Sequence, residues 1–182
     1  SVMGQVLSFA EAEGLVSRNV ARLAPAITYA PTERDHINLD EVKRFVTAAG
    51  EHRLSAAIVV MISLGLRPGE ATGLCWANVD LDAGVIHVRQ SLKHHPDPET
   101  GRPVLVIGPL RTKRSVRSLR IPAFALAELR RHLITQDAER QAEPAWSNPD
   151  DLVFTTMVGT PIDPANLRRT VRTFPKSDHY DV

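Results

Sequence analysis

Apolar residues recur at helical spacing in several stretches of the chain. The pattern over residues 5–16 predicts a short helix that a polar turn closes. Residues 38–49 predict a second helix, because they open with the spacing of a capping box and Gly50 follows their last apolar position. Residues 53–66 are apolar on almost every side, which predicts a helix buried in the middle of a domain.

A short fourth helix is predicted directly after this buried one. Gly65 ends the apolar run, and Pro68 suits the first position of a new helix. Glu70 then falls in the first turn, where the positive end of the helix dipole favours a carboxylate. Arg67 therefore lies at a rigid junction between two helices, at the first place where the chain surfaces.

Alternation of apolar and polar residues follows and predicts strands over residues 85–91, 104–107 and 115–122. The segments between them are rich in Pro, Gly and basic residues, as turns are. We expect these strands to form one small antiparallel sheet. The remaining predicted elements are a helix over residues 123–140, a short strand over 151–156, and a helix over 163–174 with Asp163 as its N-cap and Pro164 at its first position.

These elements describe an α+β fold that is mostly helical and carries a small antiparallel β-sheet. A polar stretch flanked by Pro25 and Pro31 has the composition of a linker. We therefore expect residues 1–31 to be the end of one helical domain plus a linker, and residues 32–182 to be a second domain. The first part is too short to bury a core of its own.

Composition excludes several classes of protein. The 182 residues are 43% hydrophobic, enough for a sizeable core, but the longest apolar run is too short to span a bilayer. The first residues lack the features of an export signal, so we expect a cytoplasmic protein with no membrane partner. The single cysteine, Cys75, has no disulfide partner within the chain and suits a small buried position.

The sequence predicts no metal site and no small-molecule cofactor. The histidines show no second pair with metal-ligand spacing: His94 and His95 are expected in a polar turn, and His87 on a strand. A Gly-rich phosphate loop is also missing from the sequence, which disfavours a metabolic enzyme that handles phosphate.

The net charge is only +1, but the charges are unevenly distributed. Residues 111–120, which we call the basic segment, hold five cations and no acid: Arg111, Lys113, Arg114, Arg117 and Arg120. Such a segment points to phosphate, most often that of a nucleic acid. The alternative is a solvated surface strand.

The order of these motifs resembles a known family. The stretch "LGLRPGEATGLCWANVDLDAGVIHV", then "TKRSVRSLRIP", then "LVFTTMVGTPIDPANLRRTVRTF" is similar to the catalytic domain of the tyrosine recombinases, or phage integrase family. The resemblance covers about residues 38–174. It implies DNA recombination and DNA integration for a mobile element, by attack of a tyrosine on a DNA phosphate. The implied partners are double-stranded DNA and other recombinase subunits.

The resemblance also implies roles for particular residues. Arg67 matches the first catalytic arginine, and Glu70 matches the acid that orients it or a neighbour. Arg111 stands where the family has a lysine that protonates the leaving oxygen, and arginine is a poor proton donor. Lys113 could replace that lysine, because side chains two residues apart on an extended strand share a face. Arg114, Arg117 and Arg120 are expected to contact DNA phosphate or to be solvated charges.

The second half of the family's site does not follow in this sequence. After the last predicted helix the family has an "HxxR" box and then the nucleophilic tyrosine, but here only "PKSDHYDV" follows. Tyr180 and His179 stand too close to that helix and in the wrong order, and Tyr29 lies in the linker. We therefore expect a truncated, incomplete catalytic domain. It is either part of a recombinase enzyme or a non-catalytic DNA-binding remnant of an integrase.

Overall fold

The computed structural model describes residues 2–24, 47, 50 and 52–173. The chain forms two compact units, Ser1–His36 and Ile37–Val182. The helix expected over residues 38–49 lies outside the described residues apart from Thr47. The domain boundary expected after residue 31 stays a prediction. Among the described residues, no helix has the length and apolar character needed to cross a membrane.

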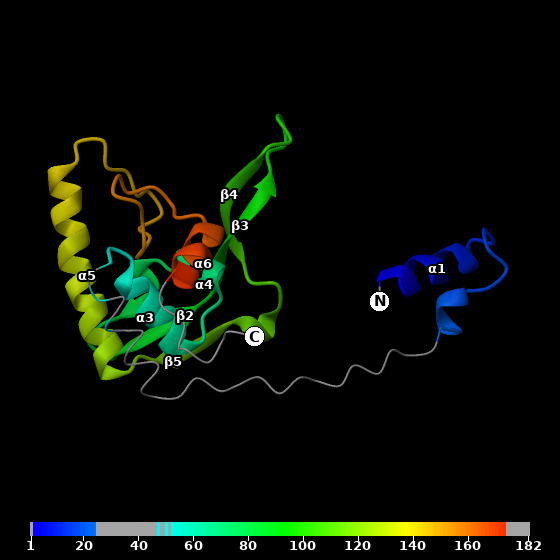
Figure 1. The fold of residues 1–182 in the computed structure, drawn as a ribbon, viewed down its shortest axis with the longest axis horizontal. Helices are drawn as coiled ribbons and strands as arrows, with labels where there is room; N and C mark the ends of the chain where they lie inside the picture. Colours follow the sequence, from blue (N-terminus) through cyan, green and yellow to red (C-terminus); the bar gives the residue numbers. More distant parts are fainter. Residues whose placement is uncertain (1, 25–46, 48–49, 51, 174–182) are drawn as a thin grey trace. The chain divides into compact units, whose positions relative to one another are not determined.

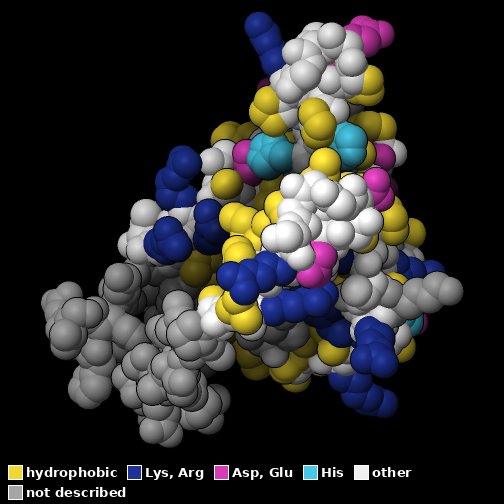
Figure 2. Space-filling view, turned by 90° about the vertical axis from the view of Figure 1, so that its right-hand side faces the viewer, with side chains coloured by type: hydrophobic (Ala, Val, Ile, Leu, Met, Phe, Trp, Pro, Cys, Tyr) yellow, Lys and Arg dark blue, Asp and Glu magenta, His cyan; other side chains and the backbone are white. Residues whose placement is uncertain are grey.

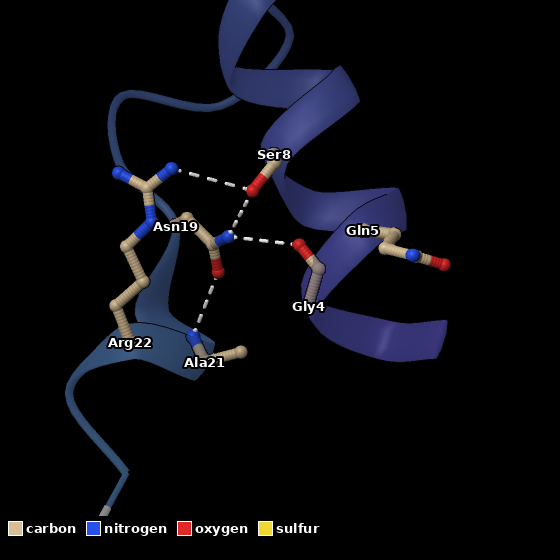
Figure 3. A pocket seen from close by; sticks show the side chains of 6 residues that line it. All are labelled: Gly4, Gln5, Ser8, Asn19, Ala21 and Arg22. Carbon is tan, nitrogen blue, oxygen red and sulfur yellow. Dashed lines mark hydrogen bonds between the residues drawn. The ribbon is translucent and has the colours of Figure 1, made fainter. Parts of the chain in front are cut away.

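The first unit consists of helix α1 (Val2–Ala12) and a 3-10 turn, η1 (Val20–Arg22). Buried Asn19 holds them together (Figure 3): its amide nitrogen donates to the Gly4 carbonyl and the Ser8 hydroxyl, while its oxygen accepts from the Ala21 amide. The predicted short helix is confirmed. Most of its large apolar side chains are exposed: Val2, Met3, Val6 and Phe9.

The core of the second unit is built on helix α3 (Ser55–Leu64), whose first seven residues are all buried. Helix α5 (Ala123–Ala142) packs against it (Figure 1). Gly65 ends α3 in the left-handed conformation, with φ of 61°, where a side chain would be strained. Helix α4 (Pro68–Thr72) begins three residues after Gly65. The buried helix and the short helix after it are as the sequence predicts.

The strands form two sheets, so the expectation of a single sheet is wrong. Strands β1 (Val79–Asp80), β2 (Val85–Val88) and β5 (Arg117–Arg120) make an antiparallel sheet in the order β1-β2-β5. Among the described strands, β3 (Gln90–Pro96) and β4 (Pro103–Pro109) pair only with each other, and they form a ribbon that stands out from the body (Figure 1). The alternating stretch over residues 85–91 is therefore split between the two sheets at Arg89.

Residues 151–156 do not form the predicted strand, and make only isolated bridges, such as Cys75 with Leu152. Their backbone groups are satisfied from elsewhere. The Gln136 amide of α5 donates to the carbonyls of Leu152 and Val153, and the Val153 amide donates to the Leu74 carbonyl. The stretch is apolar because it fills the core, where Phe154 is fully buried, and not because it lies in a sheet.

The last described helix is α6 (Pro164–Thr173), which packs against α4. Its start is as predicted: Asp163 accepts a hydrogen bond of 2.8 Å from the Ala165 amide, and Pro164 is the first helical residue. Two further 3-10 turns are η2 (Trp76–Asn78) and η3 (Lys113–Ser115). The architecture confirms the predicted α+β fold, with two small antiparallel sheets where one was expected.

Candidate functional site

Arg67 and Glu70 form the centre of the candidate site, at the start of α4. Arg67 is the residue before the helix, and its backbone amide donates to Glu70 Oε2 at 3.1 Å. Its guanidinium Nη1 donates to Glu70 Oε1 at 3.0 Å. The Glu70 side chain is only 2% exposed, whereas that of Arg67 is 75% exposed. A buried carboxylate therefore fixes one edge of a guanidinium group that otherwise faces solvent.

A second guanidinium shares the same carboxylate. Arg117 on β5 donates from Nη2 to Glu70 Oε2 at 2.8 Å and from Nη1 to the Ser115 carbonyl at 3.1 Å. Its side chain is 28% exposed. Burial works to raise the pKa of Glu70, but the hydrogen bonds from Arg117 and Arg67 outweigh it and hold that pKa below its usual value. We call Arg67, Glu70 and Arg117 the Arg67 centre.

Two glycines allow α4 to lie against the ribbon. A Cβ atom on Gly73 would stand 2.5 Å from the Leu92 backbone nitrogen, and one on Gly69 would stand 2.7 Å from the Leu92 carbonyl oxygen. The Gln90 side chain fixes the contact further, because it donates to the Gly73 carbonyl at 2.9 Å. The glycines of the "RPGEATG" stretch therefore set the distance between the Arg67 centre and β3.

The first half of the basic segment is not an extended strand. Residues 113–115 form the turn η3, and the hydroxyls of Thr112 and Ser115 lie 2.9 Å apart. The argument that Lys113 shares a strand face with Arg111 is therefore wrong, because the backbone is not extended there. Arg111 and Arg114 are exposed, and the Lys113 side chain lies outside the described atoms.

The second half of the basic segment does not present one surface either. Arg117 pairs with Val88 and Arg120 pairs with Val85 across the β2 and β5 register. Residues three apart on a strand point to opposite faces of its sheet. Arg117 lies on the face of buried Val88 and is taken up by Glu70, while Arg120 is on the other face and exposed.

His94 and His95 lie on β3, so their predicted place in a turn is wrong, while His87 lies on a strand as predicted. His94 Nε2 stands 3.1 Å from Asp163 Oδ2 and links the ribbon to the start of α6. Hydrogen bonding to the Ala165 amide and then to His94 lowers the pKa of Asp163. Within residues 2–24 and 52–173, no three His, Cys, Asp or Glu side chains lie close enough together to hold a metal ion.

Sequence reasoning did not find two features of this region. One is the contact between Glu70 and Arg117, which lie 47 residues apart, so that no local pattern reveals it. The other is a set of exposed arginines on α6: Arg168, Arg169 and Arg172. Their helical spacing, with no acid among them, was a readable signal in the sequence.

No protein-family model matches the chain. A tyrosine recombinase XerC-like protein of Caldanaerobacter subterraneus subsp. tengcongensis is 31% identical over 147 residues, which are 78% of this chain and 38% of that protein. An integrase of Streptomyces ambofaciens is 28% identical over 181 residues, which are 94% of this chain and 44% of that protein. The chain thus spans about two fifths of the length of these curated relatives.

Solved structures share the fold at lower identity. The integrase of transposon Tn1549, in complex with transposon right end DNA, gives a TM-score of 0.70 at 14% identity and covers 96% of this chain and 57% of that one. A lambda integrase tetramer bound to a Holliday junction gives 0.53 at 17% identity, over 93% of this chain and 41% of that one. By sequence similarity and by fold, the chain is therefore related to the tyrosine recombinases, the phage integrase family.

Proposed function

We propose that this chain is the DNA-phosphate-binding part of a site-specific recombinase or integrase. The observation that carries the proposal is the Arg67 centre, in which a buried, ionised Glu70 fixes the exposed guanidinium of Arg67. An exposed arginine with a free edge can donate two parallel hydrogen bonds to a phosphate. The relatives named tyrosine recombinase and integrase support DNA as the source of that phosphate.

The chemistry of strand exchange explains why the guanidinium would be held still. When a tyrosine attacks a DNA phosphate, the bond to the leaving oxygen of the strand breaks as the phosphotyrosyl bond forms. Negative charge builds up on the phosphate oxygens in between. A donor that is already oriented stabilises this charge, and loss of one such donor raises a barrier by on the order of 3 kcal/mol. In this proposal Arg67 contacts the phosphate, and Glu70 and Arg117 position Arg67.

The basic segment has a second part in the proposal. The leaving oxygen needs a proton, and Lys113 can supply one where Arg111 cannot, because a guanidinium does not release its proton near neutral pH. Arg111, Arg114 and Arg120 are exposed cations that suit contacts with the DNA backbone. Arg117 is assigned to Glu70 rather than to DNA, since its guanidinium is already engaged.

The proposed partners are double-stranded DNA and further recombinase subunits. The Tn1549 integrase structure contains transposon end DNA, and the lambda integrase structure is a tetramer on a Holliday junction. The chemistry requires no metal or small-molecule cofactor, because a tyrosine and fixed cations are sufficient for it. An intracellular location follows from DNA as the substrate.

The nucleophile is the part that we do not assign to these 182 residues. No "HxxR" box precedes either tyrosine of the sequence, Tyr29 or Tyr180, and both lie outside the described residues. We propose that the chain alone binds DNA without cutting it. This activity would suit either a segment of a longer recombinase or a non-catalytic remnant of an integrase.

A nicked suicide duplex tests both parts of this proposal in one experiment. The chain should form a complex that weakens as salt rises, with a slope of about 0.9 in log affinity against log salt for each phosphate contact. Denaturing electrophoresis should show no covalent protein–DNA band. Absence of any complex at low salt would contradict DNA binding. A covalent band that disappears in Tyr180→Phe would contradict the assignment of the nucleophile outside this chain.

A further inference from the structure

The arginines of α6 form a surface that lies outside both the Arg67 centre and the basic segment. Arg168, Arg169 and Arg172 occupy helix positions i, i+1 and i+4 and are all exposed, while Leu167 on the other side is fully buried. We call these three side chains the α6 stripe. None of them makes an ion pair or a side-chain hydrogen bond with another described residue.

Helix α5 offers a comparison, because acids stand near its arginines. Each of its three arginines stands near an acid: Arg130 near Asp82 at 4.0 Å, Arg131 near Glu128 at 2.5 Å, and Arg140 near Asp137 at 3.7 Å. Helix α6 contains no acid between Pro164 and Thr173. Asp163, the residue before the helix, interacts electrostatically with Arg169. Arg168 and Arg172 are therefore the two arginines of the stripe that have no acid partner among the described residues.

Leaving the α6 stripe unbalanced has a cost. Arg168 and Arg172 are like charges four residues apart, a spacing that destabilises a helix. A cation in the last turn offsets the helix dipole, which accounts for Arg172 but not for Arg168 in the second turn. An anion bound from outside the chain would offset the repulsion between these arginines. The exposed stripe is accessible to such an anion.

The helix that carries the stripe is anchored at its start and packs against the helix that follows Arg67. Asp163 caps the helix and contacts His94 of the ribbon, while Leu167 is anchored in the core. Helix α6 packs against α4, which begins after Arg67. Figure 2 shows Lys and Arg side chains, in dark blue, spread across the middle of the face that is turned to the viewer.

We propose that the α6 stripe binds the phosphate backbone of duplex DNA, next to the phosphate that Arg67 contacts. The inference rests on the proposed function and adds a contact surface to it. Duplex DNA carries one charge per about 1.7 Å of its axis, and one turn of α-helix rises about 5.4 Å, so several phosphates can face the stripe at once. Contacts of this kind fix the position of the duplex and carry no base sequence information.

The test compares two double variants that remove the same charge. The stripe variant is Arg168→Gln with Arg172→Gln, and the matched control is Arg130→Gln with Arg140→Gln on α5. Fluorescence anisotropy with an unrelated 30-base-pair duplex is measured over a range of KCl concentrations. We expect the slope of log affinity against log salt to fall by about 2 in the stripe variant and to stay within error of wild type in the control.

Each outcome bears on one claim. If wild type does not bind duplex, the proposed function fails first. If wild type binds and the stripe variant keeps its slope, or if both variants change alike, the α6 inference is overturned while the proposed function stands. Binding to phosphatidylserine vesicles is measured for the same proteins. If the stripe variant loses vesicle binding that wild type has, and binds duplex DNA as wild type does, the inference is also overturned.

A measurement on wild type covers the case in which the stripe variant does not fold. Phenylglyoxal modifies exposed arginines, and peptide mass spectrometry reports which ones have reacted. Duplex DNA should protect Arg168 and Arg172 severalfold and leave Arg130 and Arg140 as reactive as before. Equal reactivity of the α6 arginines with and without bound duplex would overturn the inference.

Discussion

At the scale of single residues, the sharing of Glu70 by two guanidinium groups determines what each cation can do. Arg117 uses both of its terminal nitrogens inside the protein, on Glu70 and on the Ser115 carbonyl. Arg67 uses one terminal nitrogen on Glu70 and exposes most of its side chain. Two arginines with the same formal charge thus differ in what they leave free, and in the proposed function Arg117 positions Arg67 while Arg67 contacts the phosphate.

We predict that Arg117→Gln destabilises the fold, whereas Arg120→Gln on the same strand does not. Arg117→Gln removes a partner of the buried Glu70, and such a loss lowers the free energy of unfolding by about 1–3 kcal/mol. Substitution of an exposed residue such as Arg120 changes this free energy by no more than about 0.5 kcal/mol. Urea denaturation at pH 7 measures both free energies of unfolding. Equal losses in the two variants would contradict the shared role of Glu70.

The pH dependence of the same two proteins gives a second check on Glu70. In wild type the pKa of Glu70 lies below its usual value. Burial raises this pKa, but the hydrogen bonds from Arg117 and Arg67 lower it by more. Its stabilisation is therefore present above the unfolded pKa, about 4.3, and is lost as pH falls through the lower folded value. The stability gap between wild type and Arg117→Gln should narrow in that acidic range. A gap that is independent of pH would mean that Glu70 is not the group affected.

At the scale of elements, the close packing of α4 on β3 connects the ribbon to the Arg67 centre. We predict that Gly73→Ala lowers the free energy of unfolding by about 1–3 kcal/mol, as overpacking does. The reason is that the added Cβ of residue 73 would collide with the Leu92 backbone. Gly108→Ala on β4 is the matched control, since no atom lies within 4 Å of its added Cβ. Denaturant midpoints measure both changes. Similar midpoints for the two variants would contradict a tight contact between α4 and the ribbon.

Elements that depend on local signals could be predicted from the sequence, and those that depend on distant partners could not. Gly65 and Pro68 fix where α3 ends and α4 begins, because their backbone preferences act without help from the rest of the fold. Alternation over residues 85–91 cannot show that β2 pairs with β5 while β3 pairs with β4. The apolar run over residues 151–156 looks like a strand because burial produces the same pattern.

At the scale of the whole molecule, the nearly balanced net charge conceals an uneven arrangement. Acids stand near the arginines of α5, whereas the arginines of the α6 stripe are exposed without an ion pair and the Arg67 side chain is 75% exposed. The sequence could reveal the basic segment, since its five cations fall within ten residues and no acid lies among them. It could not reveal that Arg117 and Arg120 lie on opposite faces of a sheet, because that depends on which strand β5 pairs with.

The most direct test of the account is nuclear magnetic resonance of the arginine side chains during titration with duplex DNA. The chain is 20.1 kDa, and Arg67→Lys assigns the Nε–H signal of Arg67. Arg53 is the internal reference, because its Nε already donates to Glu139 at 2.7 Å. We predict that the Arg67 signal shifts as DNA is added, while the Arg53 signal stays in place. Binding of DNA with an unchanged Arg67 signal, or with equal shifts at both arginines, would contradict a phosphate site at Arg67.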